Sequence, residues 1–422
     1  MNTRVFRDPV HGLIGFPEED AGFLRVVDTR AMQRLRRIRQ MGFASLVYPG
    51  AEHSRFGHAL GAYHVAQRVV AALALPHEVA RDVRAAAMLH DVGHGPYSHA
   101  WEAALGGPSH ESWGRRIVDE DEELHTAVES IEPGMAARLG RFFAGDYTPR
   151  YAKKLVSSQL DVDRMDYLLR DAHYSGVEYS TYDLDWIVHA LRIAPVRSGS
   201  DGDDLVVDYR RGMHAVEQYL FGRCSMYAQV YLHKTVRAAE WLFLLTLRRF
   251  ATLAQAGREP VGLEPAAALA RGETISVAAY LSLDDARVAC ALDDWAARSD
   301  DGVLRDLAAR LCARRLFKTI ELGDDPALPA LLAPKLLDTA RARFGDDAEY
   351  YCAIDETSRY GYETRPGEEL FVVGHPRHGT VELGELVREQ GLGRQVFSAR
   401  VIAAPELLPA LAAVIAAEAR RG

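Results

Sequence analysis

The stretch MLHDVGHGPYSHAWE, residues 88–102, carries an adjacent histidine and aspartate, His90 and Asp91, with further histidines close behind. Upstream, His58 stands in the segment SRFGHALG. Imidazole and carboxylate ligands suit divalent metals from Mg and Mn through Fe to Zn, so the ligand types leave the ion open. A His-Asp pair joined by a distant His and a distant Asp can bind such an ion between helices and leave positions free for water and phosphate. The stretch therefore predicts a helical protein with a metal site.

The hydrophobic pattern predicts helices over most of residues 20–250. Apolar residues recur there at spacings of three and four, among many Ala, Leu and Arg residues. Turn-rich segments at 42–54 and 195–204 interrupt the pattern. The segment DLVVDY at 204–209 predicts a short strand, and we expect one long helix from about 211 to 250.

Toward the C-terminus the pattern becomes mixed. After two or three helices, residues 350–383 alternate apolar and polar side chains between turn residues, which is typical of strands. The segment at 405–422 predicts a final helix, with Pro near its start and Arg at its end. The expected fold class is mainly α: a helical core domain over 1–250, with its principal motifs at about 50–175, and a smaller α+β region over 251–422.

The composition excludes several classes of protein. A net charge of -9 argues against broad affinity for nucleic acid, whose phosphates require a basic surface. The N-terminus has no apolar signal region, and no stretch approaches the length of a membrane span. The four cysteines lie far apart without a CxxC pair, which is typical of reduced thiols. We therefore expect a soluble, cytoplasmic protein with no membrane partner and no nucleic-acid partner.

The fourth metal ligand is expected at Asp163, in SSQLDVDRMDYLLRDAHYSG at 157–176. Asp163, Tyr167 and Asp171 recur every four residues, so they share one face of a helix, and Arg164 flanks that face. Most polar stripes of this kind are solvated faces. The basic neighbour and the tyrosine favour the wall of a pocket over that alternative.

A second group of ionisable residues follows the His-Asp pair. Any one histidine is more often a core or capping residue than a catalytic one. Four such groups within about twenty residues of a metal pair favour general acid-base catalysis. We expect Glu102 and His110 to form an orienting pair and His99 to protonate a leaving oxygen, with His94 beside them.

Two further patterns concern anions. Arg223, Tyr227, Tyr231 and Lys234 follow one another at steps of four, four and three, and two cations framing two aromatic rings suit a phosphate chain and a sugar or base. The basic run RAMQRLRRIRQ at 30–40 is either a solvated helix face or an anion site. The chain contains neither a GxxxxGK[ST] phosphate loop nor a GxSxG elbow.

Taken together, these segments resemble the HD-domain phosphohydrolases, and within them the deoxynucleoside triphosphate triphosphohydrolases, a branch that includes the animal SAM-and-HD-domain enzyme. The resemblance covers roughly the first 245 residues. It runs in order from RDPVHGLI (7–14) through DTRAMQRLRRIRQMG (28–42), YPGAEHSRFGHALG (48–61), HDVGHGPYSH (90–99) and DVDRMDYLLRD (161–171) to YLHK (231–234).

The resemblance implies a role for each matching residue. The metal ligands would be His58, His90, Asp91 and Asp163, and the catalytic residues His94, His99, Glu102 and His110. The triphosphate contacts would be Arg55, Arg164 and Arg223, and the deoxyribose and base contacts Gln40, Tyr167, Asp171, Tyr227 and Tyr231. Two positions differ from the animal enzyme, which has Asp in place of Glu102 and His in place of Tyr227.

The implied reaction is attack of metal-activated water on the α-phosphorus of a dNTP, which releases a deoxynucleoside and inorganic triphosphate. The divalent cation could be Mg, Mn, Fe, Ni or Zn, and dGTP is the first candidate among the substrates. One alternative is another HD-domain phosphohydrolase, such as a nucleotidase or phosphodiesterase. The other is a non-enzymatic nucleotide sensor, which would have no need of a complete ligand set.

The resemblance also implies regulation by a nucleotide. In this family the region that matches 28–36 binds an effector at a subunit interface, and Asp28, Gln33 and Arg36 stand at those positions. The expected assembly is a homotetramer activated by dGTP, GTP or another dNTP. The C-terminal region would then serve oligomerisation and regulation.

Overall fold

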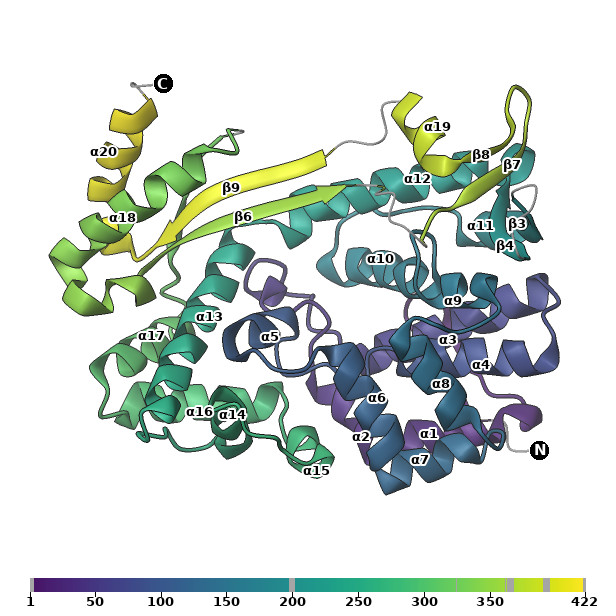
Figure 1. Ribbon diagram of the computed structural model, residues 1–422, viewed down its shortest axis with the longest axis horizontal. Helices are drawn as coiled ribbons and strands as arrows, with labels where there is room; N and C mark the ends of the chain where they lie inside the picture. The colour runs from purple at the N-terminus through teal and green to yellow at the C-terminus, as the bar shows by residue number, and fades with distance from the viewer. Residues whose placement is uncertain are drawn as a thin grey trace.

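The protein is mainly helical, as predicted. The computed structural model describes residues 4–196, 202–323, 325–360, 362, 368–389 and 395–419. Figure 1 shows the helices of the N-terminal half packed together, while the later helices and sheets lie to their left and along the top of the view. No helix in these described ranges is both long and apolar enough to cross a membrane. None of the four cysteines, all of which lie in the described ranges, forms a disulfide bond.

The helices of the core follow one another with short connections. They are α1 (Ala21–Asp28), α2 (Arg30–Arg34), α3 (Arg55–Ala72), α4 (His77–Leu89), α5 (His99–Leu105), α6 (His110–Glu120), α7 (Glu122–Glu129), α8 (Met135–Ala144), α9 (Arg150–Val156), α10 (Val162–Ser175) and α11 (Leu184–Ala190). The later helices are α12 (Tyr209–Met226), α13 (Lys234–Gln255), α14 (Glu264–Ala270), α15 (Val277–Leu281), α16 (Asp285–Arg298), α17 (Gly302–Cys312), α18 (Leu328–Phe344), α19 (Leu383–Glu389) and α20 (Leu408–Ala419).

Within the described ranges, three small sheets complete the fold. The first is a hairpin of β1 (Val5–Asp8) and β2 (Gly12–Gly15). The second has the order β3-β4-β7-β8, made of Leu191–Pro195, Asp203–Asp208, Phe371–His375 and Gly379–Glu382, with β4 and β7 parallel. The third has the order β5-β9-β6, made of Lys318–Glu321, Gln395–Ala403 and Cys352–Tyr360. The strands predicted within 350–383 are thus present, but they belong to two different sheets.

Helix α3 is buried along most of its length, between α4 and α10. Its close approach to α10 depends on Gly61, because a Cβ atom there would lie 1.9 Å from Asp166 Oδ1. Helix α10 begins at an N-cap, where the side chain of Asp161 accepts a hydrogen bond from the backbone N–H of Arg164 at 2.7 Å. It ends at Gly176, whose φ of +73° is the left-handed conformation that glycine adopts readily. These caps set where α10 begins and ends, and they place Asp163 in its first turn.

The prediction of one long helix from about 211 to 250 is wrong. The chain forms α12, then a π-helical turn at Tyr227–Tyr231, and then a separate helix, α13. His233 caps the new helix, since its Nδ1 accepts from the backbone N–H of Thr235 at 3.2 Å. Figure 1 shows that α12 and α13 run in clearly different directions.

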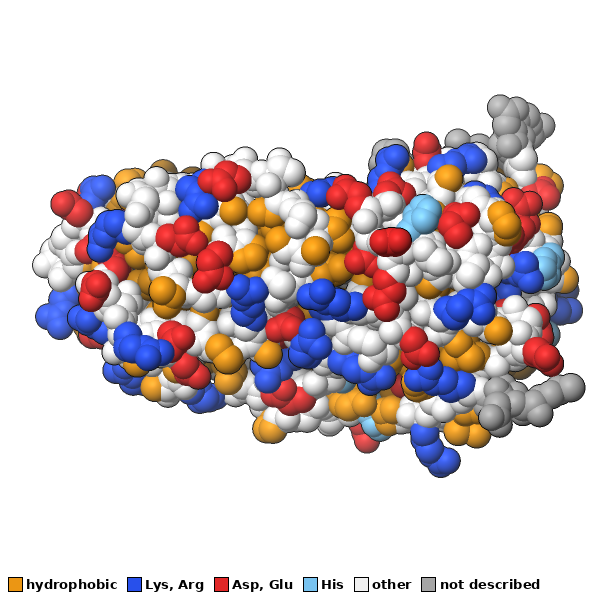
Figure 2. All heavy atoms as spheres, turned by 90° about the horizontal axis from the view of Figure 1, so that it is seen from below, with side chains coloured by type: hydrophobic (Ala, Val, Ile, Leu, Met, Phe, Trp, Pro, Cys, Tyr) orange, Lys and Arg blue, Asp and Glu red, His pale blue; other side chains and the backbone are white. Residues whose placement is uncertain are grey.

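The face seen from below in Figure 1 carries mixed charge. In Figure 2, Lys and Arg side chains are interspersed with Asp and Glu side chains, and hydrophobic side chains gather near the middle of the view. The described residues of this face therefore do not present one continuous basic surface.

Candidate functional site

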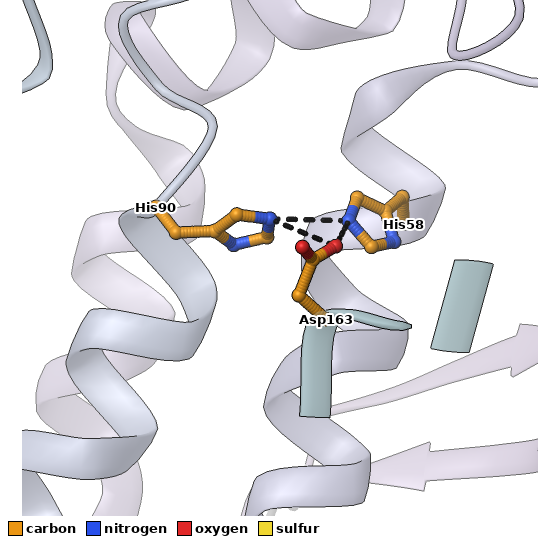
Figure 3. Close-up of side chains that lie close together, drawn as sticks. All are labelled: His58, His90 and Asp163. Atoms are coloured by element: carbon orange, nitrogen blue, oxygen red, sulfur yellow. Dashed lines mark hydrogen bonds and ion pairs between the residues drawn. The ribbon is translucent and has the colours of Figure 1, made fainter. Parts of the chain in front are cut away.

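Three of the predicted metal ligands meet at one point (Figure 3). His58 lies on α3, His90 follows the last residue of α4, and Asp163 lies in the first turn of α10. The Asp163 Oδ1 atom is 3.0 Å from His58 Nε2 and 3.4 Å from His90 Nε2. The two Nε2 atoms are 3.2 Å apart. Distances of this size show that one ion could contact all three ligand atoms.

Asp91 borders the same point. Its Oδ1 atom lies 3.3 Å from His90 Nε2, and its Oδ2 atom lies 3.7 Å from His58 Nε2. Arg55 donates a hydrogen bond to Oδ2 of Asp91, so its guanidinium contacts a predicted metal ligand. Arg55 also lines the cavity, where the sequence predicted that it contacts the triphosphate. The structure thus brings the four predicted ligands together.

A second layer of contacts fixes the two histidine rings. His58 Nδ1 pairs with Asp166 Oδ2 at 2.7 Å, and His90 Nδ1 lies 2.8 Å from the carbonyl oxygen of Ala87. Asp166 is held in turn by His11 Nε2 at 2.6 Å and by Arg170 at 2.8 and 2.9 Å. With both Nδ1 atoms engaged, both Nε2 atoms are turned toward the shared point.

The electrostatics of this group also fit a divalent cation. Burial lowers the pKa of His58, but the carboxylates of Asp163 and Asp166 outweigh it and raise that pKa to about 10. Burial raises the pKa of Asp163, yet His90 and His58 hold it below its usual value. The carboxylates thus favour positive charge between the rings, and a metal ion supplies positive charge while its ligands stay deprotonated. The residues present therefore fit the ion that the resemblance implies.

Sequence reasoning missed the second layer. Asp166 follows Asp163 by three residues on α10, and this spacing was the available signal for its position. His11 stands in the N-terminal segment 7–14, which took part in the resemblance, but no pattern linked it to a residue 155 positions away.

A second histidine-carboxylate group lies beside the first. The rings of His94 and His110 stack with centroids 3.9 Å apart. Glu102 Oε1 is 3.1 Å from His110 Nδ1 and 3.6 Å from His94 Nδ1, and Glu102 Oε2 is 3.5 Å from His99 Nδ1. On the other side, His94 Nε2 is 3.3 Å from Asp91 Oδ1. This second cluster therefore connects directly to the metal ligands.

The members of the second cluster differ in environment. The side chain of His99 is 76% exposed, while that of His94 is buried. Burial and the charge of Arg55 lower the pKa of His94 well below its usual value, which favours the neutral form of its ring. Burial raises the pKa of Glu102, but hydrogen bonds from His110 and His99 hold it below its usual range. A neutral histidine, an ionised carboxylate and an exposed histidine are suited to proton transfer.

Most predicted site residues line a single cavity of about 1250 Å³. Those at its surface are Gln40, Arg55, His90, Asp91, His94, His99, His110, Asp163, Arg164, Tyr167, Asp171, Tyr227 and Tyr231. His58, Glu102 and Arg223 each contact one of these residues from behind. A cavity of this size with a few convergent polar groups is typical of a ligand site.

Two arginines lie at one wall of the cavity, Arg164 on its surface and Arg223 behind it. Arg164 donates to Asp161, and Arg223 donates to Gln159 Oε1 at 2.9 Å. The Nε atoms of both arginines are buried, and within the described part of the chain neither has a hydrogen-bond partner. Two buried guanidinium nitrogens without an acceptor favour an anionic ligand beside them.

The tyrosines form the adjacent wall. The π-helical turn brings the Tyr227 and Tyr231 rings to 5.2 Å from each other. Tyr231 donates to Asp171 Oδ2 at 2.7 Å, and His53 Nε2 pairs with Asp171 Oδ1 at 2.8 Å. Both carboxylate oxygens of Asp171 therefore already have a hydrogen-bond partner. One of these partners, His53, was not among the predicted site residues. Lys234, expected on the same helix face, follows the helix break and is exposed.

The cavity extends beyond the predicted residues, onto α13 and β6. Arg237, Glu240 and Trp241 of α13 and Asp355 of β6 line it as well. Strand β6 belongs to the C-terminal region, which was expected to serve oligomerisation and regulation. Part of that region therefore contributes directly to the site.

The residues matched to a regulatory nucleotide site lie elsewhere. Gln33 Oε1 accepts from Arg36 Nε at 2.8 Å, and the Arg36 guanidinium lies 3.6 Å from the centre of the Phe56 ring. Asp28 pairs instead with Arg4 at 2.6 Å. The structure thus brings Gln33 and Arg36 together, while Asp28 is bound to a different residue.

Comparison with known proteins identifies the relatives of this site. Residues 55–171 match the model of the HD domain. The protein YwfO of Bacillus subtilis, named as uncharacterized, is 34% identical over 376 residues, which cover 87% of this chain and 82% of that protein. A crystal structure of a phosphohydrolase from Bacteroides thetaiotaomicron superposes with a TM-score of 0.78 at 28% identity, covering 95% of this chain and 100% of that chain.

A third relative is named for its activity. The deoxynucleoside triphosphate triphosphohydrolase SAMHD1 homolog of Dictyostelium discoideum is 26% identical over 260 residues, or 57% of this chain and 48% of that protein. The similar part thus spans about half of that relative's length, and the matched HD domain contains all four predicted ligands.

Proposed function

This chain belongs to the HD-domain family of phosphohydrolases, and we propose that it is a metal-dependent triphosphohydrolase of deoxynucleoside triphosphates. The proposed products are a deoxynucleoside and inorganic triphosphate, and dGTP is the first substrate to test. The observation that carries the proposal is that Arg164, Tyr167 and Tyr231 line the same cavity as the predicted metal ligands, with Arg223 behind this wall against the Tyr227 ring. Guanidinium groups suit phosphates, and tyrosine rings suit a sugar and a base.

His58, His90, Asp91 and Asp163 would hold the cation, which would lower the pKa of a bound water and polarise a phosphoryl oxygen. Arg164 and Arg223 would bind the triphosphate and offset the negative charge that develops there. His99, exposed at the cavity, would protonate the 5′ oxygen as it leaves the α-phosphorus. Glu102 would hold His99 and His110 in place through its two oxygens.

The test is to incubate the purified protein with each dNTP, separately and in mixtures, with Mg, Mn, Fe, Ni or Zn. Triphosphate together with a deoxynucleoside would support the proposal. Orthophosphate or a nucleoside monophosphate would contradict it and indicate another HD-domain phosphohydrolase, such as a nucleotidase or phosphodiesterase. Absence of any turnover with all ions and nucleotides would indicate a nucleotide sensor.

We further propose that the enzyme is a homotetramer activated by dGTP, GTP or another dNTP, in the cytoplasm. Support comes from the exposed position of Asp28 and from the contact between Gln33 and Arg36 on the neighbouring helices. Turnover that appears only in nucleotide mixtures would support activation. Light scattering with and without dGTP would test the assembly, and a monomer under both conditions would contradict it.

A further inference from the structure

The α13 side of the cavity contains a carboxylate that the proposed reaction does not use. Glu240 and Arg237 lie one turn apart on α13, and Asp355 faces them from β6. All three residues line the cavity that holds the metal ligands. Their side chains differ in exposure: Glu240 is 26% exposed and Asp355 only 2%.

Asp355 is fully engaged by its neighbours. It accepts from Arg237 Nε at 3.1 Å, from Arg237 Nη2 at 2.6 Å and from Trp241 Nε1 at 2.9 Å. These bonds fix the plane of the Arg237 guanidinium, because Nε and Nη2 bind one carboxylate as a pair. Asp355 therefore has a structural role and little capacity left for a ligand.

Glu240 is fixed at one oxygen and open at the other. Arg237 Nη1 donates to its Oε2 atom. Within the part of the chain that the structure describes, no group donates to its Oε1 atom. A carboxylate accepts hydrogen bonds and donates none while ionised. The rigid Arg237 thus holds an oriented acceptor toward the cavity.

An oriented carboxylate distinguishes between nucleobases. The pairing edge of guanine presents two adjacent N–H donors, at N1 and at the 2-amino group. Adenine presents one donor next to an acceptor, and thymine presents a single N–H between two carbonyl groups. Each good bidentate contact discriminates strongly against a base with the wrong pattern, so Glu240 matches guanine.

The position of Glu240 agrees with a base contact. Burial and the nearby Asp355 carboxylate raise the pKa of its carboxyl above the usual value, and the charges of Arg237 and His99 oppose this rise in part, so His99 is within electrostatic reach. His99 is the proposed donor to the 5′ oxygen, so the nucleoside extends from that end of the cavity. We propose that Glu240 selects guanine by accepting hydrogen bonds from its N1–H and 2-amino groups, at Oε1 and at the lone pair of Oε2 that Arg237 leaves free; this inference rests on the proposed function.

The test compares dGTP with dITP, which lacks only the 2-amino group. For the wild type we expect kcat/KM to be about tenfold higher for dGTP, and Glu240→Gln to bring that ratio close to one. The matched control is Glu264→Gln, because Glu264 also pairs with an arginine, Arg287, but on the surface and away from the cavity. An unchanged ratio in Glu240→Gln, or an equal fall for all four dNTPs, would contradict the inference.

Calorimetric binding of dGTP and dITP in the presence of EDTA separates this inference from the proposed function. Suppose that the protein has no triphosphohydrolase activity but binds dGTP more tightly than dITP, and that Glu240→Gln abolishes this preference. The guanine site would then be supported and the proposed reaction contradicted. Hydrolysis of dNTPs together with equal affinity for dGTP and dITP would support the proposed reaction and contradict the guanine site. Thermal unfolding of Glu240→Gln, expected near that of the wild type, verifies that the variant is folded.

Discussion

The two histidine-carboxylate clusters of the cavity differ in how firmly they are held. In the first, His58 and His90 each use Nδ1 for a second-layer partner and turn Nε2 toward Asp163. In the second, His94 Nδ1 is buried without a hydrogen-bond partner among the described residues, and His99 is largely exposed. The first cluster could therefore hold a cation in one place, whereas the second has the less constrained side chains that our proposal assigns to proton transfer.

The backbone explains part of this difference. The first cluster draws two of its residues from α3 and α10, which have 18 and 14 residues. The second depends on α5, which has only 7 residues and is preceded by Tyr97 and Ser98 at φ of +51° and +53°. Left-handed backbone at residues other than glycine is costly and is often associated with functional sites. The entry to α5 is therefore strained, whereas α3 and α10 are regular.

The largest effect is expected from replacing Asp163, the carboxylate that lies close to both histidines of the first cluster. Asp163→Asn should lower kcat by about a thousandfold or more, the scale on which catalytic groups act, because the cation is no longer held. Metal content per protein, measured by elemental analysis, should fall with it. The control is Asp185→Asn, which removes an aspartate that is 83% exposed. An Asp163→Asn protein with normal metal content and turnover would remove Asp163 from the site.

The second cluster should respond in a different way. His99→Gln should reduce kcat by about a hundredfold, the usual contribution of a general acid, and leave metal content unchanged. His214→Gln serves as the control, since that side chain is 98% exposed. If His99→Gln lost metal as well, the two clusters would form one unit and the distinction between them would be wrong.

The second layer is the next test of the first cluster. Asp166→Asn should weaken metal binding by about 10- to 100-fold, the usual cost of losing such a partner, because the His58 ring is no longer fixed by a charge. Excess metal should then restore much of the activity, which distinguishes weakened binding from unfolding. A positioning role for Asp166 would be contradicted if excess metal did not restore activity and a competition titration showed unchanged metal affinity.

The sequence predicted the local parts of this site well. The period of four in Asp163, Tyr167 and Asp171 follows from helix geometry, and the structure places all three on the cavity wall. The strand at 204–209 was also expected, and β4 occupies Asp203–Asp208. These features depend on residues that are close in the chain, so their pattern is visible in it.

The parts that escaped prediction depend on distant contacts. Asp355 meets Arg237 across 118 positions, and no periodicity links β6 to α13. The break after Tyr231 is another example, because its apolar spacing is equally compatible with a continuous helix. Contacts of Tyr231 with Asp171 and of Tyr48 with the Gln229 carbonyl accompany the π-helical turn, and both are tertiary.

The smallest effect concerns the reach of Glu102 within the second cluster. Glu102→Asp keeps the charge but withdraws the carboxylate by one methylene group from His110 and His99, which now lie 3.1 and 3.5 Å away. Weakening one such contact costs about 1 kcal/mol, so kcat should fall roughly threefold to tenfold. KM and metal content should stay constant, because neither the phosphate wall nor the first cluster changes. If Glu102→Asp instead lowered kcat as much as His99→Gln does, the geometry of the second cluster would be as constrained as that of the first.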